Sequence, residues 1–148
     1  HLTAGRDVIF LCEGDPFFFG SFMYLFERLK AAHPCKVVPG VTSLTACAAE
    51  LGRPLAARND VLKVLPAPLD ADALTRELET AQSVAIIKVG RHFDKVRAVI
   101  EVLGLTSRAW IVEAATNPDQ KVRPLGDVPA GDRPYFSTIL IYRGEEQW

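Results

Sequence analysis

Residues 13–21, with the sequence EGDPFFFGS, combine two carboxylates with glycines and aromatic side chains. They follow an apolar run of strand length and precede a run of helical period, and open α/β sheets bind ligands at such turns. Gly14 permits a bend and close approach of a ligand, while the charges of Glu13 and Asp15 favour a cationic or hydroxylated ligand over a phosphate. A plain turn with aromatic core residues behind it is an equally good interpretation.

A second turn of this kind has the sequence VPGVTS at residues 38–43. Thr42 or Ser43 is suited to cap a helix that begins there, which is the simpler role. The alternative is a binding site for a ribose or carboxylate, because the backbone amides at the start of a helix attract anionic groups.

Basic residues form the third group: Lys88 lies at the end of a predicted strand and Arg91 follows that strand, in the sequence KVGRH. Arg53 and Arg58 lie further upstream. A solvated basic face is the default interpretation. The alternative is a site for a polycarboxylate, oriented by arginine forks. His92 has no cysteine or second histidine near it, so we expect no metal site. The absence of a Ser-His-Asp order, a P-loop and a zinc signature argues against hydrolysis and phosphoryl transfer.

Strand-length apolar runs alternate with helical periods, which predicts an α/β fold with largely parallel strands. The last strands, separated by too few residues for a helix, should pair antiparallel and give a mixed sheet. Strands are predicted at Val8–Cys12, Val37–Val38, Val61–Leu65, Val84–Val89, Ala109–Val112 and Tyr135–Tyr142, with the stretch QKVRPL contributing near the end.

Four helices are predicted from apolar spacing and end signals. Phe22, Leu25, Phe26 and Leu29 form one stripe, and a short helix runs from Thr42 or Ser43 to Gly52. The third begins after Asp70 as its N-cap, with Leu69 and Leu74 placed as a hydrophobic staple, and the fourth carries Val96, Val99, Ile100 and Leu103 and closes at Gly104.

Composition restricts the class of protein. With 148 residues and 49% hydrophobic content, the chain is large enough to bury a core without disulfides or metals. A net charge of −1 offers no overall field for nucleic acid or a membrane, and no apolar run is long enough to span one. We therefore expect a cytoplasmic protein with no nucleic-acid partner, whose cysteines, Cys12, Cys35 and Cys47, are buried and reduced.

A polar, turn-rich stretch near residues 53–60 predicts a domain boundary. Residues 1–55 contribute only two predicted strands, too few for a sheet of their own, and they begin almost at once with a buried-looking strand, so the chain looks cut. We expect residues 1–55 to be the end of an N-terminal α/β domain and residues 56–148 to be a complete C-terminal α/β domain.

The segments EGDPFFFGSFMYLFERL, VVPGVTSLTACAAELGRPLAARNDVLKVLPA, IIKVGRH and PYFSTILI resemble the tetrapyrrole methylase family. The resemblance covers essentially the whole chain. PFFFGSFMYL and GRPLAARNDVL resemble the members that methylate carbon 20 of precorrin-2 in cobalamin biosynthesis. It implies a two-domain α/β fold, S-adenosylmethionine as methyl donor with S-adenosylhomocysteine as product, a tetrapyrrole acceptor and a homodimer of the complete protein.

The resemblance also implies roles for particular residues. The donor site would contain Glu13, Gly14, Asp15, Phe18, Thr42, Ser43, Lys88 and Ala115. The carboxylates and flat ring of the acceptor would be met by Phe17, Arg53, Arg58 and Arg91. No residue is nominated as catalytic base, because the sulfonium donor is already activated and alignment supplies much of the rate.

One family motif, a glycine-rich GxGPGD-like loop after the first strand, does not occur in these residues. We therefore expect the full-length protein to methylate precorrin-2 and this chain alone to be inactive. Three alternatives stay open: a cobalt-precorrin-2 acceptor, methylation at another ring position, and a ligand-binding or regulatory module without catalysis.

Overall fold

The structure is a computed structural model that describes residues 1–144. The chain divides into two compact units, of which the smaller is His1–Thr42 and the larger begins at Ser43. Among the described residues, none of the helices has the length and apolar character needed to cross a membrane.

The smaller unit contains a 3-10 turn, η1 (Leu2–Ala4), and one helix, α1 (Phe22–Leu29). The strands predicted at Val8–Cys12 and Val37–Val38 are wrong: both segments are irregular, and Ile9 is 85% exposed. The physical reason is that a strand is stabilised by hydrogen bonds to a neighbouring strand, and residues 1–42 provide none.

The predicted apolar stripe of α1 is confirmed and lies in an aromatic cluster. Phe17 meets Phe26 edge-on with ring centroids 5.0 Å apart, and Phe10 lies 5.2 Å from Phe22. Such pairs contribute about 0.5–1.5 kcal/mol each beyond their buried area. No residue of α1 is fully buried, however, so the cluster is not a closed core.

A five-stranded sheet with the order β1-β2-β5-β3-β4 organises the larger unit. Only β1 and β2 pair parallel; β5 lies between β2 and β3 and pairs antiparallel with both, and β4 is antiparallel to β3. The mixed sheet and antiparallel last strands are confirmed, whereas largely parallel pairing is wrong because β5 separates β2 from β3. The strands are β1 (Leu62–Pro66), β2 (Ser83–Ile87), β3 (Ala109–Glu113), β4 (Lys121–Pro124) and β5 (Ser137–Tyr142).

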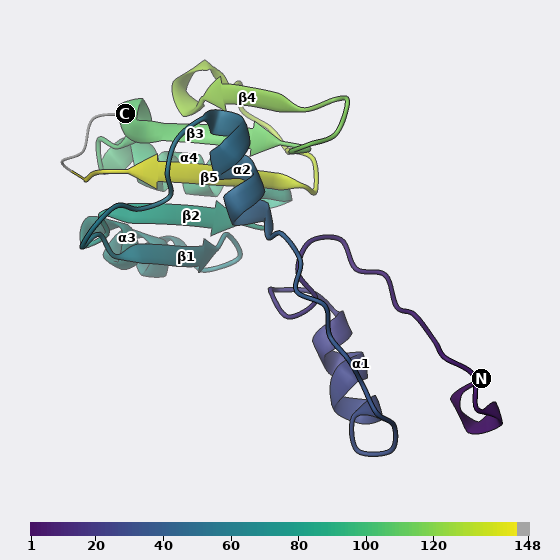
Figure 1. Cartoon of the computed structure of the whole chain (residues 1–148). Coiled ribbons are helices and arrows are strands. Elements are labelled where there is room, and N and C mark those ends of the chain that lie inside the picture. Colours follow the sequence, from purple (N-terminus) through teal and green to yellow (C-terminus); the bar gives the residue numbers. More distant parts are fainter. Residues whose placement is uncertain (145–148) are drawn as a thin grey trace. The chain divides into compact units, whose positions relative to one another are not determined.

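Helices cover both faces of this sheet, as Figure 1 shows: α3 (Ala71–Glu79) and α4 (Phe93–Val102) lie behind it, and α2 (Ser43–Leu51) crosses its front. Every residue of β2 is buried, as expected for a strand covered on two sides. The core behind the sheet includes Leu74 of α3 and Phe93 of α4, both 0% exposed. Burying each such side chain contributes about 1.5–3 kcal/mol.

The predicted helix ends are confirmed. Asp70 caps α3, because its Oδ1 accepts a hydrogen bond from the backbone N of Ala73 at 2.7 Å. Gly104, with φ +65°, follows α4 in the left-handed conformation that glycine tolerates best. α2 runs from Ser43 to Leu51, within the bounds predicted for it.

The cysteines differ in burial. Cys47 on α2 is buried, and burial raises the pKa of its thiol. Cys12 is half-buried and Cys35 is exposed. The prediction of three buried thiols is thus right only for Cys47, because the smaller unit has no closed core to receive the other two.

Candidate functional site

The edge at which β1, β2 and β3 end is the carboxyl edge of the larger unit, and it carries unusual backbone conformations. Lys88 directly follows β2 with φ +58°, and Ala114 and Thr116 follow β3 with φ +49° and +67°. Positive φ costs a residue with a side chain about 1–3 kcal/mol and concentrates at functional sites. This edge is therefore the strongest candidate for ligand binding in the larger unit.

Residues 131–136, here called the aromatic loop, lead into β5 at the same edge. The backbone N of Arg133 donates to the carbonyl of Gly90 at 3.1 Å, and Ala114 N donates to the carbonyl of Phe136 at 2.8 Å. Gly131 N donates to Oδ1 of Asp94 at 2.9 Å. The loop is thereby fastened to the turns that follow β2 and β3.

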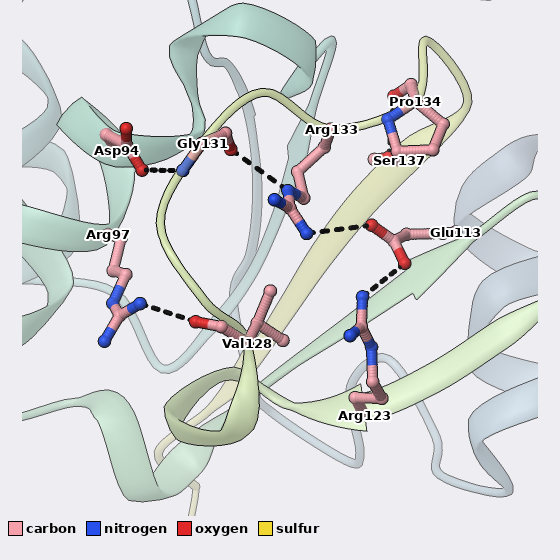
Figure 2. A network of polar contacts seen from close by, with 9 residues as sticks. All are labelled: Asp94, Arg97, Glu113, Arg123, Val128, Gly131, Arg133, Pro134 and Ser137. Atoms are coloured by element: carbon pink, nitrogen blue, oxygen red, sulfur yellow. Dashed lines mark hydrogen bonds and ion pairs between the residues drawn. The ribbon is translucent and has the colours of Figure 1, made fainter.

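A buried carboxylate strengthens this attachment, as Figure 2 shows. Glu113, the last residue of β3, is 3% exposed. Its Oε2 accepts from Nη2 of Arg123 at 2.6 Å, and Nη1 of Arg133 lies 3.8 Å from its Oε1. Arg133 also stacks over the ring of Phe93 at 5.0 Å. Two guanidinium groups compensate the buried charge, and one of them belongs to the aromatic loop.

In the smaller unit, Asp15 joins the two turns that the sequence singled out. Its Oδ1 accepts from Phe17 N at 2.9 Å and its Oδ2 from Gly40 N at 2.8 Å. These bonds, first that from Gly40, lower the pKa of the Asp15 carboxyl. A side chain on Gly40 would overlap the carbonyl of Gly14, so the turns approach more closely than any residue but glycine allows.

The predicted donor residues fall on these two structures. Glu13 and Gly14 lie on the first turn of the smaller unit, where Glu13 is exposed and Gly14 has φ +78°. The remaining positions are Asp15 between the turns, Phe18 edge-on to Phe19 at 5.1 Å, Thr42 at the end of the second turn, Ser43 at the start of α2, and Lys88 and Ala115 at the carboxyl edge of the larger unit.

The predicted acceptor residues are not all brought together. Arg91 lies on the turn after β2, at the carboxyl edge. Arg53 stacks over Trp110 at 5.3 Å, near the start of β3 and hence at the opposite, amino edge, and Arg58 lies in the loop before β1. Phe17 belongs to the aromatic cluster of the smaller unit. Within the larger unit, only Arg91 shares an edge with Lys88 and Ala115.

A small cavity at the amino edge is lined by Arg53, Arg108, Trp110 and Tyr142 among others, with room of about 20 Å³. That volume accommodates about one water molecule. This cavity is therefore too small to enclose a nucleoside or a macrocycle.

Sequence reasoning missed the residues that hold the carboxyl edge together. Glu113 ends an apolar strand with a charge, and Arg133 lies within the aromatic loop, directly before Pro134. A charge inside an apolar run is a signal for a buried ion pair. Tyr135 and Phe136 were assigned to the last strand, but β5 begins at Ser137, so both aromatic residues belong to the loop.

A mixed, helix-covered sheet makes this an α/β protein, and the strained turns make its carboxyl edge the candidate ligand site. The family can be stated more closely: the chain belongs to the Tetrapyrrole (Corrin/Porphyrin) Methylases, whose family model matches residues 1–129.

Named relatives agree with this assignment. The chain is 41% identical to the cobalamin biosynthesis protein CobIJ of Mycobacterium tuberculosis (strain ATCC 25618 / H37Rv), over 99% of this chain and 29% of the relative. It is 38% identical to a precorrin-2 C(20)-methyltransferase of Sinorhizobium sp, over 95% of this chain and 58% of the relative. The chain thus spans less than two thirds of either relative.

Solved structures share the fold. The crystal structure of the methyltransferase CobJ superposes with a TM-score of 0.73 and 21% identity, covering 95% of this chain and 66% of that chain. Uroporphyrin-III C-methyl transferase from Thermus thermophilus, complexed with S-adenyl homocysteine, gives a TM-score of 0.60 and 26% identity, covering 86% of this chain and 62% of that chain.

Proposed function

We propose that the protein containing this chain transfers the methyl group of S-adenosylmethionine to carbon 20 of precorrin-2. The observation that carries the proposal is membership of the tetrapyrrole methylase family, together with 38% identity to a relative named for this reaction. The strained carboxyl edge supports it, because positive-φ backbone follows both β2 and β3 where a ligand would bind.

The residues of this chain fit the proposed donor. Glu13 presents an exposed carboxylate beside the exposed Gly14, and a negative charge suits a ligand with sulfonium and ammonium groups. A structural neighbour is described as a complex with S-adenyl homocysteine, the demethylated form of the donor.

The donor supplies an activated methyl group on a positively charged sulfur. The acceptor carbon would form a bond to that methyl carbon while the sulfur–carbon bond breaks and its electron pair stays on sulfur. The acceptor carbon would then lose a proton to a side chain, a substrate carboxylate or water. In our proposal each unit contributes contacts of its own: Glu13, Asp15 and Thr42 of the smaller unit are donor contacts. In the larger unit, Lys88 and Ala115 are donor contacts and Arg91 is an acceptor contact. Well-aligned reactants in general reach effective molarities of about 10⁵ to 10⁸ M.

The decisive experiment uses the complete gene product with labelled S-adenosylmethionine and precorrin-2. We expect label in one methyl group at carbon 20, located by NMR of the product. Label at another ring carbon would replace this proposal with methylation at a different position. Parallel reactions with cobalt-free and cobalt-containing precorrin-2 would identify the acceptor that is used.

A non-catalytic binding or regulatory module is the alternative from another class. It would bind S-adenosylhomocysteine and transfer no methyl group under any of these conditions. The absence of the glycine-rich motif from these residues favours the non-catalytic alternative for the 148-residue chain taken alone. Turnover by this chain would contradict our expectation that it is inactive by itself.

Three further parts of the proposal come from the sequence, and the homodimer among them from the resemblance. Residues 1–55 would end the N-terminal domain and residues 56–148 would form the C-terminal domain of the complete protein. We also propose a homodimer and a cytoplasmic location. Light scattering of the complete gene product would test the homodimer.

A further inference from the structure

Tyr135 and Phe136 of the aromatic loop are exposed side by side just before β5. Tyr135 is 78% and Phe136 54% exposed, and their rings are 5.0 Å apart in an edge-to-face arrangement. Adjacent exposed apolar side chains can mark an interaction site, because burying aromatic rings is favourable. The pair thus forms a small exposed apolar surface. It lies at the sheet edge where Lys88, Ala114 and Thr116 have positive φ.

The backbone beneath the pair is held on both sides. Phe136 accepts a hydrogen bond from Ala114 N through its carbonyl, and Arg133 donates to the carbonyl of Gly90. Ser137 Oγ donates to the carbonyl of Pro134 at 2.7 Å, as Figure 2 shows beside the Glu113–Arg133 contact. Because the loop is fixed before any ligand arrives, little ordering entropy is lost on binding.

Charge at this edge specifies the kind of ligand. Gly90 and Ala114, the two anchors of the loop, belong to the turns that carry Lys88, Arg91 and Ala115. Arg91 and Lys88 are both exposed. Of the carboxylates here, Glu113 is compensated by two arginines, Asp94 accepts from Gly131 N, and Asp132 of the loop is exposed and opposes the two cations. An aromatic surface bordered by cations is complementary to a flat, apolar ring with carboxylates on its periphery.

We propose that Tyr135 and Phe136 contact the flat face of the carboxylated tetrapyrrole acceptor, with Arg91 meeting a carboxylate at its rim. This inference rests on the proposed methyl transfer and adds two residues to it. The adenine of the donor is also flat, but it carries no carboxylate for the neighbouring cations.

The test compares the complete gene product with the double variant Tyr135→Ser/Phe136→Ser. Both side chains are exposed, so the fold should persist. Uroporphyrin III, a flat macrocycle with eight carboxylates, is the probe for the acceptor and is followed by its fluorescence; S-adenosylhomocysteine is the probe for the donor, followed by calorimetry. Val102→Ser is the control, because it removes an exposed apolar side chain at the other end of α4.

We expect the double variant to lose about tenfold or more in affinity for uroporphyrin III, with its affinity for S-adenosylhomocysteine unchanged. Val102→Ser should change neither. Undiminished porphyrin binding, or an equal loss for both probes, would overturn the inference, as would a wild-type protein that does not bind the porphyrin. Porphyrin binding lost by the variant, in a protein that never binds S-adenosylhomocysteine, would keep the aromatic contact and reject methyl transfer.

Discussion

Single residues decide how the two turns of the smaller unit meet. Asp15 uses both carboxylate oxygens on backbone N–H groups, those of Phe17 and of Gly40. The sequence predicted Asp15 as a donor contact, and this stays a prediction. The geometry adds a role that spacing could not reveal, because its partner Gly40 lies 25 residues away. An Asp in a turn is common, and nothing local identifies the distant amide it binds.

Asp15 should therefore control the two turns through its charge. Hydrogen bonds from Gly40 and Phe17 lower its pKa, so the stabilisation is complete above the ordinary aspartate range and is lost as the pH falls through the lowered pKa. We expect the amide proton shifts of Phe17 and Gly40 to titrate together in NMR, with a midpoint below that range. Asp15→Asn should abolish this titration. Independent midpoints for the two amides would contradict a shared carboxylate.

Glu113 should be far more important for stability than a surface carboxylate. Breaking a buried ion pair costs about 3–5 kcal/mol, since the partner charges stay uncompensated. We expect Glu113→Ala to lower the free energy of unfolding by about that amount in urea titrations. Glu101→Ala is the matched control: Glu101 pairs with Arg97 at 2.6 Å but is 46% exposed in its side chain, so its loss should cost less than about 1 kcal/mol. Similar losses would contradict the network.

At the scale of elements, local signals predicted helices well and strands unevenly. The Asp70 cap, the Gly104 stop and the stripe of α1 depend on neighbouring residues, and all are confirmed. Strand pairing depends on distant segments, so Val8–Cys12 reads as a strand yet has no neighbour in residues 1–42. Likewise, the insertion of β5 between β2 and β3 follows from tertiary pairing, which no local pattern contains.

The N-cap of α3 provides a test of these local signals. Asp70 satisfies the backbone N of Ala73, which otherwise has no partner inside the helix. Asp70→Ala should lower the free energy of unfolding by about 1 kcal/mol. The control is Asp72→Ala. Asp72 lies two residues later, in the first turn of α3, and the cap is made by Asp70, so this substitution should cost clearly less. An equal cost for the two variants would show that charge near the helix start matters and the capping bond does not.

At the scale of the whole molecule, the predicted domain boundary near residue 55 separates α2 from the sheet that α2 covers. The buried core cluster begins at Leu65, and the predicted domain boundary near residue 55 stays a prediction. Yet α2, which precedes that boundary, covers the front of the sheet, where Leu44, Cys47 and Ala48 are buried. The side chain of Cys47 also forms a hydrogen bond with Thr138 of β5. Sequence composition detects the polar stretch near residue 55 but not which sheet the helix before it covers.

Two fragments test whether α2 stabilises the sheet or belongs to the segment before residue 55. Residues 43–148 keep α2 on the sheet, whereas residues 56–148 remove it and leave Thr138 and Leu140 of β5 in water, together with Val112 of β3, which pairs with Thr138. We expect the longer fragment to unfold cooperatively in urea with a midpoint close to that of the whole chain. The shorter fragment should be less stable by several kcal/mol, because the lost helix buries three side chains and each contributes on the order of 1 kcal/mol or more. Equal stability of the two fragments would mean that α2 belongs, in energy as in sequence, to the segment before residue 55.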